Sequence, residues 1–88
     1  MSSEPARDER SSVIWGLNKA VDNVEVSVAL KERNKRPTFL DYLRTRLMPE
    51  YLHFRGRAKE LGLSIEEYDK RMDRAHQAIG LEAPDYPN

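Results

Sequence analysis

Apolar residues recur at spacings of three and four along most of this 88-residue sequence, in three runs separated by turn-forming residues. This spacing places the apolar residues of each run on one face of a helix, because an α-helix turns once every ~3.6 residues. The runs are Ile14, Leu17, Val21, Val24 and Val28; Leu40, Leu43, Leu47, Tyr51, Phe54, Ala58 and Leu61; and Ile65, Tyr68, Met72, Ala75 and Ile79. The pattern predicts an all-α fold, a small bundle of three helices.

Turn and capping residues set the expected helix boundaries. Pro37 disfavours helical geometry in the residue before it, and Gly62 and Gly80 suit the positive φ that commonly follows a helix end. Ser64 and Glu67 have the spacing of a capping box at the start of the last helix. We therefore expect helices at about 13–33, 38–61 and 65–79.

Two segments leave alternatives open. Pro49 lies inside the second predicted helix, where its missing N–H removes a backbone hydrogen bond, so we expect either a kink or a break there. Residues 23–30 alternate β-branched and other side chains, a pattern that is also typical of a half-buried strand. We favour a helix for 23–30, with a strand as the alternative.

The length limits the chain to one small domain. A chain of this size buries only ~60% of the surface that its unfolded form exposes, and the absence of cysteine excludes disulfides and thiolate metal sites as a source of stability. We expect a single helical domain at 12–80. The polar ends, which contain Pro5, Pro84 and Pro87, predict flexible tails at 1–11 and 81–88.

A long second helix beside a shorter last helix is expected to leave part of its apolar stripe uncovered. Another protein, or a second copy of the chain in a homo-oligomer, would cover such a surface. Aromatic residues and Met are enriched at interfaces, so the candidate interface residues are Trp15, Phe39, Tyr42, Met48, Tyr51 and Phe54. This favours a non-enzymatic protein-binding adaptor, inhibitor or accessory subunit that acts through amphipathic helices.

The charge distribution suggests an alternative function. The whole chain balances 15 basic against 15 acidic residues, but residues 31–59 hold nine basic and three acidic residues. A basic segment of this kind can neutralise nucleic-acid phosphates, so the alternative is a nucleic-acid-binding regulatory protein, acting as a dimer. The basic candidates are Lys31, Arg33, Lys35, Arg36, Arg44, Arg46, Arg55, Arg57 and Lys59.

The sequence offers little for catalysis or metal binding. It has no glycine-rich phosphate loop or nucleophile elbow, so we expect no enzyme activity, no catalytic residues, no cofactor and no small-molecule substrate. Glu50 and His53, like Asp73 and His76, are three residues apart, the spacing found in carboxylate-bridged metal bundles. On their predicted helices His53 faces away from the apolar stripe and His76 lies at its edge, so we expect no metal site.

The ends of the chain and its hydropathy bear on location. Residues 1–10 are polar and acidic and lack the apolar centre of a secretory signal. No apolar run approaches the ~20 residues needed to cross a bilayer. We therefore expect a cytoplasmic protein without a membrane span.

Overall fold

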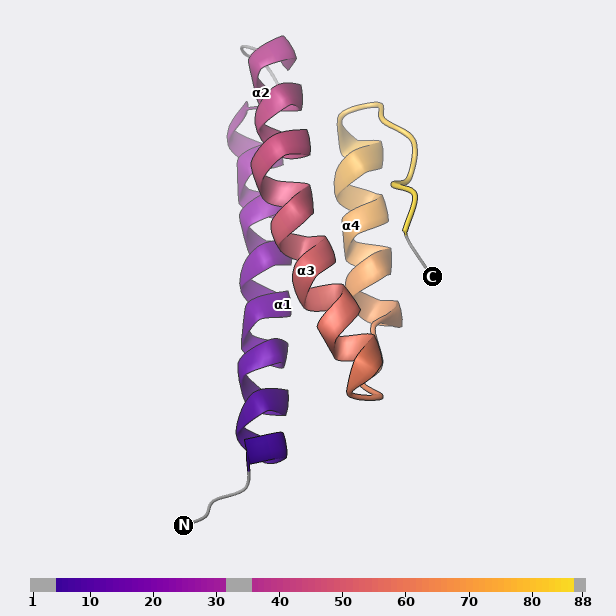
Figure 1. Cartoon of the computed structure of the whole chain (residues 1–88). Coiled ribbons are helices and arrows are strands. Elements are labelled where there is room, and N and C mark those ends of the chain that lie inside the picture. Colours follow the sequence, from indigo (N-terminus) through magenta and orange to yellow (C-terminus); the bar gives the residue numbers. More distant parts are fainter. Residues whose placement is uncertain (1–4, 32–35, 87–88) are drawn as a thin grey trace.

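The computed structural model describes residues 5–31 and 36–86, and in this part of the chain all regular structure is helical. Three helical rods lie side by side, and the predicted all-α bundle is confirmed (Figure 1). Residues 23–30 are helical, which decides against the strand alternative. The elements in chain order are α1 (Pro5–Lys31), α2 (Arg36–Tyr42), a π-helical segment η1 (Leu43–Leu47), α3 (Met48–Glu60) and α4 (Glu66–Ala78).

The first rod, α1, begins at Pro5, eight residues before the expected start. Its first turns are polar, so they have no apolar periodicity from which a helix could be predicted. Proline is compatible with a first helical turn because its missing N–H would have no partner there. Glu9 on this extension accepts a hydrogen bond from Arg57 of α3, which joins the N-terminal turns to the bundle. Residues 32 and 33 of the expected helix lie outside the described residues.

The second rod is continuous from Arg36 to Glu60, but its hydrogen bonding changes in the middle. In η1 the helix widens, and the Met48 N–H donates to the carbonyl of Leu43, five residues earlier. Pro49 follows directly in the first turn of α3, where its lack of an N–H is tolerated. The interruption expected at Pro49 is therefore a π-helical segment just before it. π-Helical turns are rare and occur mostly as single-turn insertions of this kind between α-helical segments.

Two glycines end α3 and α4, as expected. Gly62 and Gly80 have φ values of 76° and 80°. The Leu63 N–H donates to the carbonyl of Ala58 at 2.9 Å, and the Leu81 N–H makes the equivalent bond after α4. These are Schellman motifs, which satisfy carbonyls that the helix leaves unpaired.

The start of α4 differs from the capping box that the sequence predicts. The N-cap is Ile65, and no side chain caps this described helix end through a hydrogen bond. Ile65 packs against the core, so its burial fixes the entry of the chain into α4. Glu66, Glu67 and Asp69 occupy the first turn, where negative charge interacts favourably with the helix dipole.

The core lies where the three rods meet. Leu17, Val21 and Val24 of α1 are fully buried against Tyr51 of α3 and Met72 of α4. Ile14, at the edge of the same face, is exposed. No helix among the described residues combines the length and apolar character needed to cross a membrane.

The chain after α4 turns back and runs beside that helix (Figure 1). Leu81 and Tyr86 pack against the core, and the Tyr86 ring lies 6.2 Å from the ring of Tyr51, centroid to centroid. The prolines at 84 and 87 predict a flexible tail at 81–88, because they prevent a helix. In its described part, 81–86, the segment is irregular, but Tyr86 packs on the bundle.

Candidate functional site

The most exposed large apolar residues lie on the side of α1 that faces away from the bundle. Trp15, Val26 and Leu30 are 65%, 56% and 70% exposed. At ~100° per residue, Val26 lies about 20° around the helix from Trp15, and Leu30 about 40° further. Leu17, which is fully buried, lies on the opposite side. We call the surface around Trp15, Val26 and Leu30 the outer face of α1.

The middle of the outer face carries two opposite charges. Lys19 and Asp22 are both exposed and lie between Trp15 and Val26 in the sequence. The Lys19 Nζ lies 5.5 Å from the centroid of the Trp15 ring, within cation–π range. Asp22 Oδ1 accepts a hydrogen bond from Arg71 Nη2 at 2.8 Å, and the Asp22 side chain stays 58% exposed. The outer face is therefore apolar towards its ends and charged at its centre.

Trp15 also borders a shallow hollow between α1 and α3. Ser11, Ser12, Trp15 and Phe54 line this space, which has a volume of about 470 Å³. The Phe54 ring lies directly over Gly16, so closely that a Cβ atom at position 16 would overlap it. The absence of a side chain on Gly16 thus lets Phe54 pack on α1 and brings it near Trp15.

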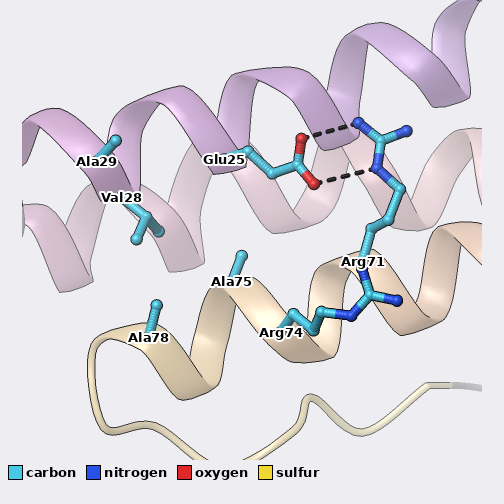
Figure 2. A pocket seen from close by; sticks show the side chains of 7 residues that line it. All are labelled: Glu25, Val28, Ala29, Arg71, Arg74, Ala75 and Ala78. Atoms are coloured by element: carbon cyan, nitrogen blue, oxygen red, sulfur yellow. Dashed lines mark hydrogen bonds and ion pairs between the residues drawn. The ribbon is translucent and has the colours of Figure 1, made fainter.

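A second hollow lies between α1 and α4 (Figure 2). Its volume is about 410 Å³, and it is lined by Glu25, Val28, Ala29, Arg71, Arg74, Ala75 and Ala78. Arg71 closes one end, because its Nε and Nη2 donate to the two Glu25 carboxylate oxygens at 3.0 and 2.8 Å. These hydrogen bonds raise the pKa of Arg71 above its ordinary value. The arginine is therefore occupied in holding α4 to α1.

The candidate interface residues do not form a single surface. Trp15 and Tyr42 are exposed, and Met48 and Phe54 are half-buried. Phe39 and Tyr51 are buried in the core. Sequence reasoning missed Val26 and Leu30. The pattern that could have identified Val26 is its spacing of 11 residues from Trp15. This is about three helical turns, which places both residues on one side of a helix.

A polar cluster links α3 to α4 near the C-terminal segment. Arg55 is buried, and its Nε and Nη2 donate to the Asp69 carboxylate at 2.9 and 3.0 Å. The Tyr51 hydroxyl donates to the same carboxylate at 2.6 Å, and Arg55 stacks over the Tyr86 ring at 4.4 Å. Burial, and then the hydrogen bond to Asp69, raises the pKa of Tyr51. Every member of this cluster contacts another member, so the cluster stabilises the packing of α3, α4 and the C-terminal segment against one another.

The basic candidates have different environments. Arg55 is paired with Asp69, and Arg57 donates to Glu9 and Glu60. The side chains of Lys31, Arg33, Lys35 and Arg36 lie outside the part of the chain whose side chains are described. Arg44, Arg46 and Lys59 are exposed. The described part of 31–59 therefore presents three exposed cations, and two of its arginines are held in ion pairs within the bundle.

The two histidines lie apart from any metal-like cluster. His53 is exposed, with its ring 5.1 Å from Phe54, centroid to centroid. His76 is buried rather than at the helix rim, and its Nδ1 lies 2.9 Å from the carbonyl of Met72. Asp73 accepts a hydrogen bond from the Tyr86 hydroxyl at 2.9 Å. Within the described ranges, no three potential metal-ligating side chains gather at one place.

Two kinds of surface could therefore serve function: the outer face of α1, and the exposed cations of 44–59. The outer face combines apolar area with a charged centre, whereas the cations lie on the rod formed by α2, η1 and α3. Comparison of the chain with protein-family models, curated proteins and solved structures found no match.

Proposed function

We propose that this protein is a small non-enzymatic adaptor, inhibitor or accessory subunit that binds another protein chain through the outer face of α1. The observation that carries the proposal is the alignment of Trp15, Val26 and Leu30 on the solvent side of a helix whose opposite side already forms the core. Single exposed apolar residues are ordinary, whereas apolar residues aligned on one side of a helix provide a surface that a partner can cover, which supports the proposal. Tryptophan is also enriched among the residues that dominate binding energy.

The bundle leaves this face accessible. α3 and α4 both pack against α1, and the residues that contact them, such as Leu17 and Val24, are on the side away from Trp15. α1 has 27 residues, whereas α4 has 13, so α1 offers a longer surface than its shorter neighbour covers. A helix that presents exposed apolar side chains is a common recognition element, because these side chains can dock into a partner.

Nucleic-acid binding through 31–59 is the second candidate. Tyr42 is 46% exposed, and Arg46, four residues further along the same rod, is exposed as well, so a cation and an aromatic ring lie about one helical turn apart. Arg44 is a further exposed cation. This combination suits single-stranded nucleic acid, where cations contact phosphates and rings stack on bases. Arg55 and Arg57 support this candidate less, because both donate to carboxylates within the bundle.

Purification of the tagged protein from its native cells, with and without nuclease, tests the proposal. We expect mass spectrometry to identify a stoichiometric protein partner that survives nuclease, and the Trp15→Ser/Leu30→Ser variant to lose it. Gln77→Ser is the matched control, because it changes an exposed residue of α4. Recovery that requires nucleic acid, or a partner retained by the double variant, would contradict binding through the outer face.

A further inference from the structure

We infer that the outer face of α1 binds the same face of a second copy of this chain, with the two helices antiparallel and related by a two-fold axis. The inference rests on the proposed function, because it names the partner of the same surface. A two-fold interface requires one surface to be complementary to itself. The outer face meets this requirement in the order of its apolar and charged residues along α1.

Exposed positions along the outer face, apart from Leu30, follow a coiled-coil spacing. Two helices that wrap around each other meet through positions alternately three and four residues apart. On α1 the exposed positions with this spacing are Ser12, Trp15, Lys19, Asp22, Val26 and Ala29. A continuous seam of exposed positions therefore runs along α1, beside Leu30, and a helix of 27 residues is ~40 Å long.

The two charges at the centre of the seam select the orientation. In a parallel pair, equivalent positions face each other, so Lys19 would meet Lys19 and Asp22 would meet Asp22. Like charges at these positions oppose association. In an antiparallel pair each helix runs the other way, and Lys19 of one copy meets Asp22 of the second copy. The alternation of charge thus favours the antiparallel arrangement.

The same charges, together with the apolar residues, select the register. When Lys19 faces Asp22 of the second copy, Trp15 faces Val26 and Ser12 faces Ala29. A shift by one heptad in one direction would place Trp15 against Lys19, and in the other would place Asp22 against Val26. Of these three registers, only the first places Trp15 against an apolar side chain and Lys19 against an acidic one. By symmetry each of these contacts occurs twice.

The contacts within one copy are compatible with this pairing. Asp22 uses one carboxylate oxygen, Oδ1, for Arg71, and Arg71 is held independently by both oxygens of Glu25. A carboxylate accepts several hydrogen bonds, so Asp22 can bind Lys19 of a second copy while it keeps Arg71. Polar residues inside such a seam lower its affinity but specify its register. We therefore expect a reversible dimer rather than an obligate one.

Variants that reverse the charge at position 19 or 22 test the inference. Their dimerisation is measured by sedimentation equilibrium over a concentration series. The full-length chain should dimerise, and Lys19→Asp and Asp22→Lys should each weaken dimerisation about tenfold or more, because each brings like charges together. Mixing these two variants should form a heterodimer, since the Asp introduced at 19 in one chain then faces the Lys introduced at 22 in the other, and the unchanged Asp22 of the first chain faces the unchanged Lys19 of the second. Val26→Ser should weaken dimerisation without a charge change, and Gln77→Ser should have no effect. Circular dichroism of each variant checks that its helices are retained.

The outcomes separate this inference from the proposed function. A chain that remains monomeric at every concentration, or a mixture of the two charge variants that associates no better than either alone, overturns the antiparallel pairing. In that case a partner protein that depends on Trp15 would still support the proposed function. A dimer that neither charge variant weakens would also overturn the pairing, because it would use another surface.

Discussion

Arg55 and Asp69 form a two-pronged ion pair between α3 and α4, with Nε 2.9 Å from Oδ1 and Nη2 3.0 Å from Oδ2. The side chains are only 10% and 19% exposed. Tyr51 donates to the same carboxylate from the fully buried core. One acidic residue of the last helix therefore satisfies both a buried cation and a buried hydroxyl.

Loss of this acid should destabilise the bundle strongly. Asp69→Ala leaves Arg55 and Tyr51 without their shared acceptor, and we expect a cost of about 3 kcal/mol in the free energy of unfolding. Urea unfolding followed by circular dichroism measures it. Glu60→Ala is the control, because it breaks an exposed ion pair with Arg57 and should leave the midpoint nearly unchanged. Equal effects of the two substitutions would contradict a structural role for the cluster.

Two glycine substitutions should change the free energy of unfolding in opposite directions. Gly16→Ala places a Cβ atom within the Phe54 ring, and we expect it to cost about 1–3 kcal/mol because the ring must move. Gly56→Ala adds a methyl group in open space inside α3, and should stabilise the protein by about 0.5–1 kcal/mol through higher helix propensity. Thermal unfolding of both variants measures the expected loss and the expected gain of stability. A harmless Gly16→Ala would rule out the close packing of Phe54 on α1.

Alkaline pH should weaken the fold. The pKa values of Tyr51 and Tyr86 are raised above the ordinary value of about 10, chiefly by burial and then by hydrogen bonds to Asp69 and Asp73. The folded state thus keeps phenol protons that the unfolded state releases, so their contribution is complete below about pH 10 and declines as the pH rises above it. The free energy of unfolding, measured between about pH 8 and 11, should fall at the upper end. Tyr51→Phe/Tyr86→Phe should flatten that decline, and an unaltered pH profile in this variant would contradict the assignment.

The C-terminal segment should contribute to stability. Tyr86→Ala removes a ring that stacks on Arg55, meets Tyr51 and donates to Asp73, and we expect a loss of about 1–3 kcal/mol. Pro84→Ala, which leaves those contacts in place, is the comparison. Denaturant unfolding of the two variants measures the difference. If Tyr86→Ala unfolds at the same denaturant concentration as the unaltered chain, the segment behaves as a free tail instead.

The helices could be predicted from the sequence, because the burial of one helix face requires apolar residues at a helical spacing. Leu17, Val21 and Val24 recur at helical spacing and are fully buried, and Gly62 and Gly80 have the positive φ that their positions predict. The start of α1 at Pro5 was not predictable in this way. Its polar turns are held by a contact to Arg57, a residue 48 positions away from Glu9.

The outer face could be predicted only in part, because its apolar residues do not form a helical series of their own. Val24, Val26 and Val28 alternate with other residues, which also suggests a strand, and as a helix this segment divides between two sides. Val24 and Val28 are buried, whereas Val26 is exposed. Arg55 shows the same difficulty. Its spacing from Tyr51 and Ala58 places Arg55 on the buried face of its helix. Asp69, the acid that allows this burial, lies on α4 and comes next to Arg55 only when the helices pack together.

The fluorescence of Trp15 tests the central claim most directly, because it is the only tryptophan of the chain and lies on the outer face of α1. We expect red-shifted emission and ready quenching by acrylamide in the dilute isolated protein, since the side chain is 65% exposed. Binding of a second chain, either at high concentration of this protein or with a purified partner, should shift the emission to the blue and protect Trp15 from the quencher. A complex that forms with no change in emission or quenching would show that association uses another surface, and would contradict the assignment of the outer face.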